Sequence, residues 1–235
     1  MDNIYIFGDS FFCRWVEDNV NYSWILQLTK KYSVCNYSIP GASNQEIYLS
    51  FLKNIDIITS NDVVLLGWSE PNRFYVNPEV TKNDKIYEMY HKNFYNKTLV
   101  KLQYQSFMSE VKKTIKEKNI KTLFFWSFPS DYIDPPKENA NWLDAILSNI
   151  NETNYQYLDS FENEVKPALI YFSKKEVEHF TSQDEIVNYF RKKDRRPNHI
   201  SNEKIHNELV KIVIEFIENK IDGQIDLIER LNNGA

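Results

Sequence analysis

The stretch NIYIFGDSFF, residues 3–12, decides the fold, because an apolar run breaks abruptly into Gly8, Asp9 and Ser10. Residues 4–7 predict a short strand, and the glycine after it predicts a sharp turn. Residues 22–32 follow with apolar side chains at helical spacing, so the chain begins as strand, turn and helix. We expect this turn to expose the Ser10 hydroxyl close to unpaired backbone N–H groups.

The same unit repeats along the chain. Apolar runs predict three further strands, over residues 33–39, 62–68 and 121–128. A helix that Ser43 or Asn44 can cap separates the first two, and a helix over residues 93–118 precedes the third. Strands that alternate with helices predict an α/β fold with a mainly parallel sheet, which binds ligands at the carboxyl ends of its strands.

The second half of the chain has a less regular pattern. Residues 155–158 are compatible with a last short strand, and we expect the segment at about 129–197 to hold a lid or cap insertion. The last clear element is an amphipathic helix over about residues 202–220. These patterns predict a single domain over residues 1–222, followed by a C-terminal tail at 223–235.

Composition excludes several classes of function. A net charge of -5 argues against general nucleic-acid binding, apart from one local basic cluster at residues 191–196. The two cysteines, Cys13 and Cys35, cannot form a disulfide framework or a four-ligand metal site, and we expect buried thiols. The sequence contains neither an apolar run long enough to span a membrane nor a secretory signal, so we expect a cytoplasmic location.

A catalytic serine needs a base, because its hydroxyl is a weak nucleophile at neutral pH. The turn Pro197-Asn198-His199 directly precedes the last helix and holds His199 at the edge of the predicted sheet. His206 falls inside that helix, where we expect a structural or partly exposed side chain.

Four blocks in order resemble those of the SGNH (GDSL-type) hydrolases, and the resemblance runs from residue 3 to about 216. The blocks are Gly8-Asp9-Ser10, Gly41, Gly67-Trp68-Ser69-Glu70 and His199. The resemblance implies a flavodoxin-like three-layer α/β/α sandwich with a five-stranded, mainly parallel sheet. It also implies an enzyme that needs no metal or cofactor.

The resemblance implies that Ser10 is the nucleophile and His199 the general base. The backbone N–H groups of Ser10 and Gly41 would hold the oxyanion, together with a side-chain donor from the third block. The family has asparagine at that third position, whereas this chain has the shorter Ser69. Either Ser69 or Asn72, in the following turn, would complete the oxyanion hole.

A second departure concerns the acid that orients the histidine. In the family this acid usually lies three residues before the histidine, where this chain has Arg196. Asp194, five residues before His199, completes a triad if the loop bends suitably. Otherwise the site is a Ser-His dyad.

The resemblance implies an ester hydrolase, either an esterase or a carbohydrate O-deacetylase, that acts on a small-molecule or carbohydrate ester. Candidate substrate contacts are Trp68, Glu70 and Arg73, although Glu70 and Arg73 can also form a surface ion pair. An O-acyltransferase with the same Ser-His machinery is an alternative. A non-catalytic binding or assembly protein is an alternative of a different class. The sequence leaves the oligomeric state open.

Overall fold

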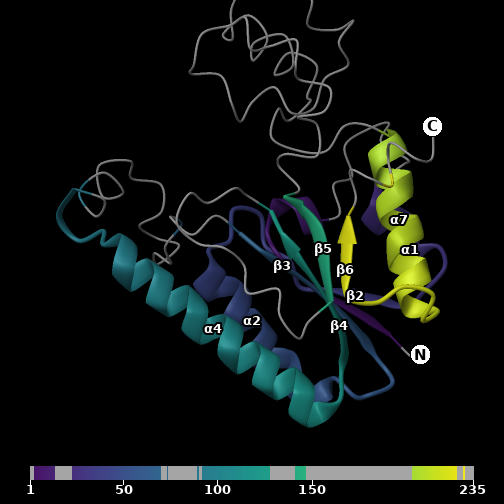
Figure 1. The fold of residues 1–235 in the computed structure, drawn as a ribbon, viewed down its shortest axis with the longest axis horizontal. Helices are drawn as coiled ribbons and strands as arrows, with labels where there is room; N and C mark the ends of the chain where they lie inside the picture. The colour runs from purple at the N-terminus through teal and green to yellow at the C-terminus, as the bar shows by residue number, and fades with distance from the viewer. Residues whose placement is uncertain are drawn as a thin grey trace, which may run out of the picture.

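The computed structural model describes residues 3–13, 23–69, 73, 89, 92–127, 141–146, 203–226 and 230. Within them, six strands form one sheet in the order β2-β1-β3-β4-β5-β6, and all neighbouring strands are parallel (Figure 1). The strands are β1 (Ile4–Phe7), β2 (Val34–Asn36), β3 (Val63–Trp68), β4 (Lys121–Trp126), β5 (Asn141–Ile146) and β6 (Gln224–Asp226). The helices are α1 (Trp24–Thr29), α2 (Asn44–Asn54), α4 (Lys97–Lys118) and α7 (Glu203–Ile217), with short 3-10 helices η1 (Ser10–Phe12) and η2 (Ile55–Ile57).

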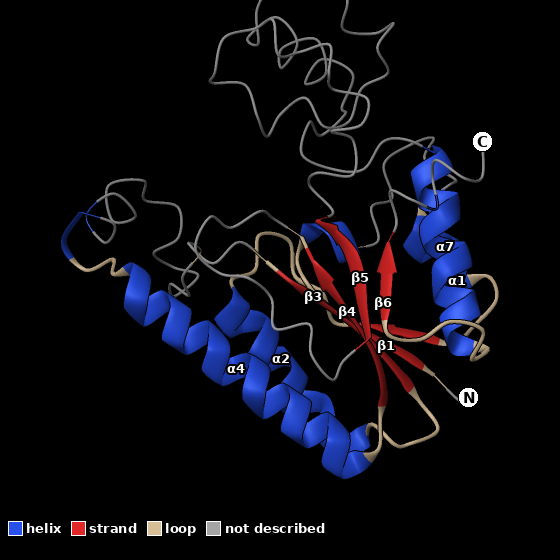
Figure 2. Cartoon of the chain, viewed as in Figure 1, coloured by secondary structure: helices blue, strands red, loops and turns tan. Residues whose placement is uncertain are grey.

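Helices cover both faces of the sheet, which gives the predicted three-layer α/β/α sandwich. Figure 2 shows α1 and α7 on one side and α2 and α4 on the other. Because side chains alternate along a strand, β1 sends Ile4 and Ile6 to the first face and Tyr5 and Phe7 to the second. The strands are therefore apolar on both faces, as expected for a parallel sheet.

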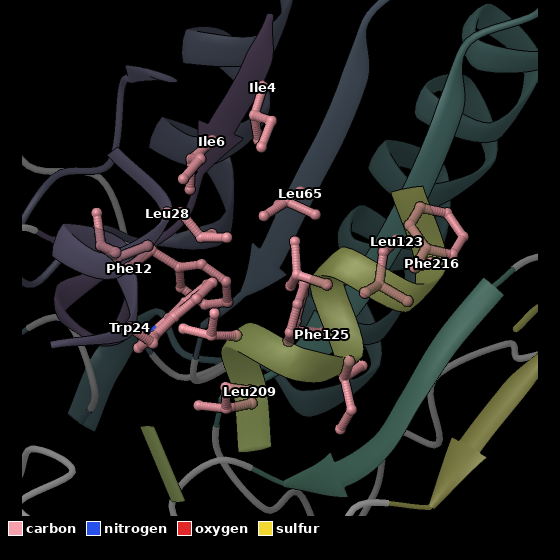
Figure 3. Close-up of a cluster of buried hydrophobic side chains, with 14 of the residues drawn as sticks. Ile4, Ile6, Phe12, Trp24, Leu28, Leu65, Leu123, Phe125, Leu209 and Phe216 are labelled. Carbon is pink, nitrogen blue, oxygen red and sulfur yellow. The ribbon is translucent and has the colours of Figure 1, made fainter. Parts of the chain in front are cut away.

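The core under α1 and α7 is built largely from large apolar side chains (Figure 3). Phe12 is fully buried in this core, with its ring edge-to-face against Trp24 at 5.5 Å and against Phe125 at 5.1 Å. The apolar face predicted for the last helix is confirmed, because Leu209, Phe216 and their neighbours on α7 are buried here. This core therefore fixes η1, which begins with Ser10, against β4 and the two helices.

The opposite core holds α2 and α4 against the sheet. Ser43 caps α2 in a full capping box: Glu46 N–H donates to Ser43 Oγ at 3.3 Å, and Ser43 N–H donates to Glu46 Oε2 at 2.8 Å. Of the two residues proposed as caps, Ser43 has this role, and Asn44 becomes the first residue of the helix. The side chain of Asn44 is therefore available for other contacts.

Three expectations about the second half of the chain are corrected. Within the described residues the sheet has six strands rather than five, since β6 adds an edge strand within the segment predicted as a tail. The domain thus extends beyond residue 222. Strand β5 lies inside the predicted insertion at 129–197 and pairs with both β4 and β6. Both strands escaped prediction because neither contains the continuous apolar run that marked β3 and β4. Residues 155–158 lie outside the described residues.

Candidate active site

The candidate site lies where the strand order of the sheet reverses. From β1 the chain crosses to β2 on one side and then to β3 on the other, so the loops after β1 and β3 diverge. Ligands of open α/β sheets bind in the crevice at such a point. Ser10 follows β1 and Ser69 follows β3, so the first and third sequence blocks meet there.

The turn that carries Ser10 is held by its neighbour, Asp9. The carboxylate of Asp9 accepts a hydrogen bond from Phe11 N–H at 3.0 Å, and its backbone carbonyl accepts from Phe12 N–H at 3.1 Å. These bonds close the single 3-10 turn of η1, which begins at Ser10. Ser10 is 6% exposed, so the residue is more enclosed than the turn alone predicted.

Gly8 and Gly67 have a packing role. The turn predicted after Gly8 is present, at Asp9 and η1, but it does not depend on a left-handed backbone at Gly8. Neither glycine has a left-handed backbone, since the glycines with positive φ in the described chain are Gly41 and Gly223. A Cβ on Gly8 would lie 2.4 Å from Cδ2 of Phe12, and a Cβ on Gly67 would lie 1.9 Å from Cε2 of the same ring. The two glycines therefore leave the space that the Phe12 ring occupies beside β1 and β3.

Asp9 joins three strand ends through its carboxylate. Oδ2 accepts a hydrogen bond from Ser69 Oγ, after β3, at 2.8 Å, and Oδ1 accepts from Ser127 Oγ, after β4, at 3.3 Å. Arg73 lies with Nη1 3.6 Å from Oδ2. Complete burial raises the pKa of the Asp9 carboxyl above its ordinary value, although Arg73 and the hydrogen bonds act in the opposite direction. Asp9 thus has a structural role and positions the turn of Ser10.

Both donors of Ser69 are engaged in the structure. Its hydroxyl donates to Asp9 and accepts from Arg73 Nη1 at 3.0 Å, and its backbone N–H donates to Asn44 Oδ1 at 2.7 Å. The Asn44 amide in turn donates from Nδ2 to the Ser69 carbonyl at 3.0 Å. A serine hydroxyl has a single proton, so Ser69 can donate to an oxyanion only if it leaves Asp9.

Gly41 occupies a turn that is compatible with an oxyanion loop. The φ of Gly41 is 76°, and Ala42 N–H donates to the Ile39 carbonyl at 3.1 Å, which defines a type II turn with Pro40 before the glycine. Ile39 N–H donates to the Gly8 carbonyl at 3.0 Å and anchors this turn beside the loop of Ser10. Among the hydrogen bonds of the described residues, none uses the N–H of Gly41.

Asn36 provides a second link between these two loops. Its Nδ2 donates to the Phe12 carbonyl at 2.7 Å, and its Oδ1 accepts from Ser38 N–H at 2.9 Å. Phe12 ends η1, and Ser38 begins the segment that leads to Gly41. One side-chain amide therefore fixes the turn of Ser10 relative to the turn of Gly41.

The remaining candidates divide into corrected and undescribed residues. Trp68 is fully buried, with its ring edge-to-face against Tyr104 at 5.4 Å, so it is a core residue rather than a surface for substrate. Arg73 pairs with Asp9. His199, Asp194, Asn72 and Glu70 lie outside the described residues.

Two polar residues at this edge were not predicted to take part in the site. Ser127 follows a recognisable strand directly, so the rule that parallel strands end at one edge could have identified it. Asn44 was considered only as a cap, and its contact with Ser69 has a sequence separation of 25 residues. No short sequence pattern predicts a contact between residues so far apart.

Cysteine, histidine and acidic residues do not form a metal site in the described part of the chain. No three or more such side chains gather there in a way that could hold a metal ion. Cys13 and Cys35 are not joined in a disulfide and are partly exposed, rather than buried as expected. No helix within the described ranges is long and apolar enough to cross a bilayer.

Comparisons with known proteins find similarity among solved structures. No protein-family model matches the chain, and no curated protein matches it. The chain is similar to the crystal structure of the psychrotrophic esterase EstA from Pseudoalteromonas sp., inhibited by monoethylphosphonate. The match covers 94% of this chain and 98% of that chain, with 13% sequence identity and a TM-score of 0.42.

Proposed function

We propose that the chain is a serine-dependent hydrolase of carboxylic esters, with Ser10 as the nucleophile. The observation that carries this proposal is the way the chain fixes Ser10 at the reversal point of the sheet. Asp9 binds the turn of Ser10 to the ends of β3 and β4. The Ile39–Gly8 hydrogen bond sets the Gly41 turn beside it. Such a fixed arrangement is what a nucleophile and its oxyanion donors require.

The reaction proceeds through an acyl-enzyme. Ser10 Oγ attacks the ester carbonyl while His199 accepts the hydroxyl proton, and the carbonyl oxygen becomes an oxyanion that the N–H groups of Ser10 and Gly41 bind. The oxyanion then collapses, the bond to the alcohol breaks, and His199 returns the proton to the departing alcohol. Water, deprotonated by His199, attacks the acyl-enzyme and releases the acid with Ser10 restored.

Two further roles belong to this proposal. Asp194 orients His199 and stabilises its protonated form, as the third member of a triad. Arg73, beside Asp9 and Ser69, holds the carboxylate that fixes the nucleophile turn. The substrate is an ester of a small or carbohydrate-borne acyl group.

Covalent labelling with a fluorophosphonate probe tests the proposal. Wild-type protein should be labelled and should hydrolyse 4-nitrophenyl acetate, whereas Ser10→Ala should do neither. Ser33→Ala is the matched control, because Ser33 lies beside the amino end of β1 and its hydroxyl donates to Asn3 Oδ1, away from the candidate site. It should behave as wild type.

The His199→Ala variant should lose the same activities while retaining the fold, measured by circular dichroism. Asp194→Asn should lower kcat by orders of magnitude if Asp194 orients His199. A folded wild-type protein without Ser10-dependent labelling would refute the hydrolase.

A further inference from the structure

Asn44 is a buried amide at the candidate site, held in one orientation by the backbone of Ser69. It is 6% exposed and starts α2, three residues after Gly41. Ser69 N–H requires an acceptor and the Ser69 carbonyl requires a donor, so Oδ1 and Nδ2 of Asn44 cannot exchange places. The position of its amide nitrogen is therefore fixed by two short bonds.

The amide of Asn44 has one unused N–H donor. A side-chain amide nitrogen carries two hydrogens, and the Ser69 carbonyl takes one of them. Among the contacts of the described residues, no acceptor meets the other hydrogen. Burying a donor without an acceptor costs free energy. The position of this hydrogen is therefore suited to an acceptor on a bound ligand.

The contacts at this edge place Asn44 in the same cluster as the nucleophile. Ser10 adjoins Asp9, whose carboxylate is 2.8 Å from Ser69 Oγ, and the carbonyl of Ser69 is 3.0 Å from Asn44 Nδ2. Ser69 itself has no uncommitted proton, because its hydroxyl and its N–H are both donating. Asn44 is thus the side chain in this cluster that combines burial, fixed orientation and an unused donor.

We propose that Asn44 supplies the side-chain donor of the oxyanion hole, beside the N–H groups of Ser10 and Gly41. The proposal rests on the hydrolase function proposed above. It assigns a catalytic role to a residue three positions after Gly41, while the backbone of Ser69 holds the Asn44 amide in place. A donor fixed before the reaction begins needs no reorganisation when negative charge develops on the carbonyl oxygen.

The first test compares two substitutions of Asn44 with a control on the same helix. Asn44→Asp retains the size and the acceptor for Ser69 N–H but removes both donors, and Asn44→Ala removes the amide entirely. Each should lower kcat for 4-nitrophenyl acetate by about 10² to 10³, with KM nearly unchanged. Asn54→Ala is the control, because Asn54 Nδ2 donates to the Ser50 carbonyl at the far end of α2. It should leave kcat unchanged.

The second test separates a donor from a merely structural residue. A thionoester develops negative charge on sulfur, which accepts hydrogen bonds weakly. Losing an oxyanion donor should therefore slow the oxo ester far more than the thionoester, so the ratio of their kcat values should fall in both Asn44 variants. A residue that only shapes the site would slow both substrates alike and leave the ratio constant.

The outcomes distinguish the Asn44 proposal from the hydrolase proposal on which it rests. If the wild-type protein shows no Ser10-dependent labelling or hydrolysis, the hydrolase and the role of Asn44 both fail. If wild type is active and Asn44→Asp keeps its kcat, or changes it with a constant oxo-to-thiono ratio, only the Asn44 donor is overturned.

Discussion

Replacing Gly67 by alanine tests the close packing beneath the candidate site. Gly67 lies inside β3, and a Cβ there would be 1.9 Å from Cε2 and 2.1 Å from Cζ of Phe12. The ring cannot move away freely, because it is fully buried against Trp24 and Phe125. The strain must therefore spread into β3 or into η1, which carries Ser10.

The size of the effect follows from the overlap. Carbon atoms in contact are about 3.5 to 4.0 Å apart, so the new methyl group would intrude by roughly 1.6 to 2.1 Å. Overpacking lowers the free energy of unfolding by about 3 kcal/mol at the upper end of its usual range. Alanine also reduces the entropy of the unfolded chain, which raises the free energy of unfolding by about 0.5 to 1 kcal/mol. We expect the free energy of unfolding to fall by about 2 kcal/mol.

Gly41→Ala is the matched control because its cost has a different origin. Gly41 has a φ of 76° but open space where a Cβ would lie, so alanine there should cost about 1 kcal/mol through backbone strain alone. Phe12→Leu should remove much of the overlap at Gly67 and none of the strain at Gly41. The double variant with Gly67→Ala should then show a favourable coupling of at least about 1 kcal/mol.

Urea denaturation, followed by circular dichroism, measures all of these variants in a double-mutant cycle. Strict additivity of Phe12→Leu and Gly67→Ala would refute the steric argument, as would an effect of Gly67→Ala no larger than that of Gly41→Ala. Coupling between Phe12→Leu and Gly41→Ala would show that the ring acts through the loops rather than through β3.

The layered fold was predictable because its determinants are local. Continuous apolar runs produced β3 and β4, and apolar residues at helical spacing produced α1 and α7, each within a few residues of its observed bounds. Strands β5 and β6 depend instead on pairing with a neighbour that is already formed. Their short, mixed sequences carry little independent signal.

The site was predictable only in its broad position. Strand ends identified Ser10, Gly41 and Ser69 because all parallel strands finish at one edge. The hydroxyl of Ser69 donates to Asp9, 60 residues away in sequence, and the amide of Asn44 donates to Ser69, 25 residues away. No local sequence pattern predicts these hydrogen bonds. Gly8 illustrates the same limit. A side chain at this position would clash with the ring of Phe12, four residues later, whereas its own backbone angle does not require glycine.

Three further substitutions probe the surroundings of the site, each by urea denaturation. Tyr104→Phe should raise the free energy of unfolding by about 1 kcal/mol, because the buried hydroxyl has no hydrogen-bond partner in the described structure; a loss would show that it is bonded. His206→Ala should cost about 2 kcal/mol, since His206 Nδ1 accepts from the buried Trp24 N–H at 3.2 Å, and more than the exposed Asn207→Ala; equal losses would contradict this role. Asp9→Asn tests the raised pKa of the Asp9 carboxyl, whose main cause is burial. The folded protein keeps this proton to higher pH than the unfolded chain does, so the stability of wild type relative to Asp9→Asn should fall as pH rises from the ordinary carboxyl pKa through the raised one. A difference that grows with pH across that window would mean that its hydrogen bonds and ion pair outweigh burial and hold the carboxyl ionised.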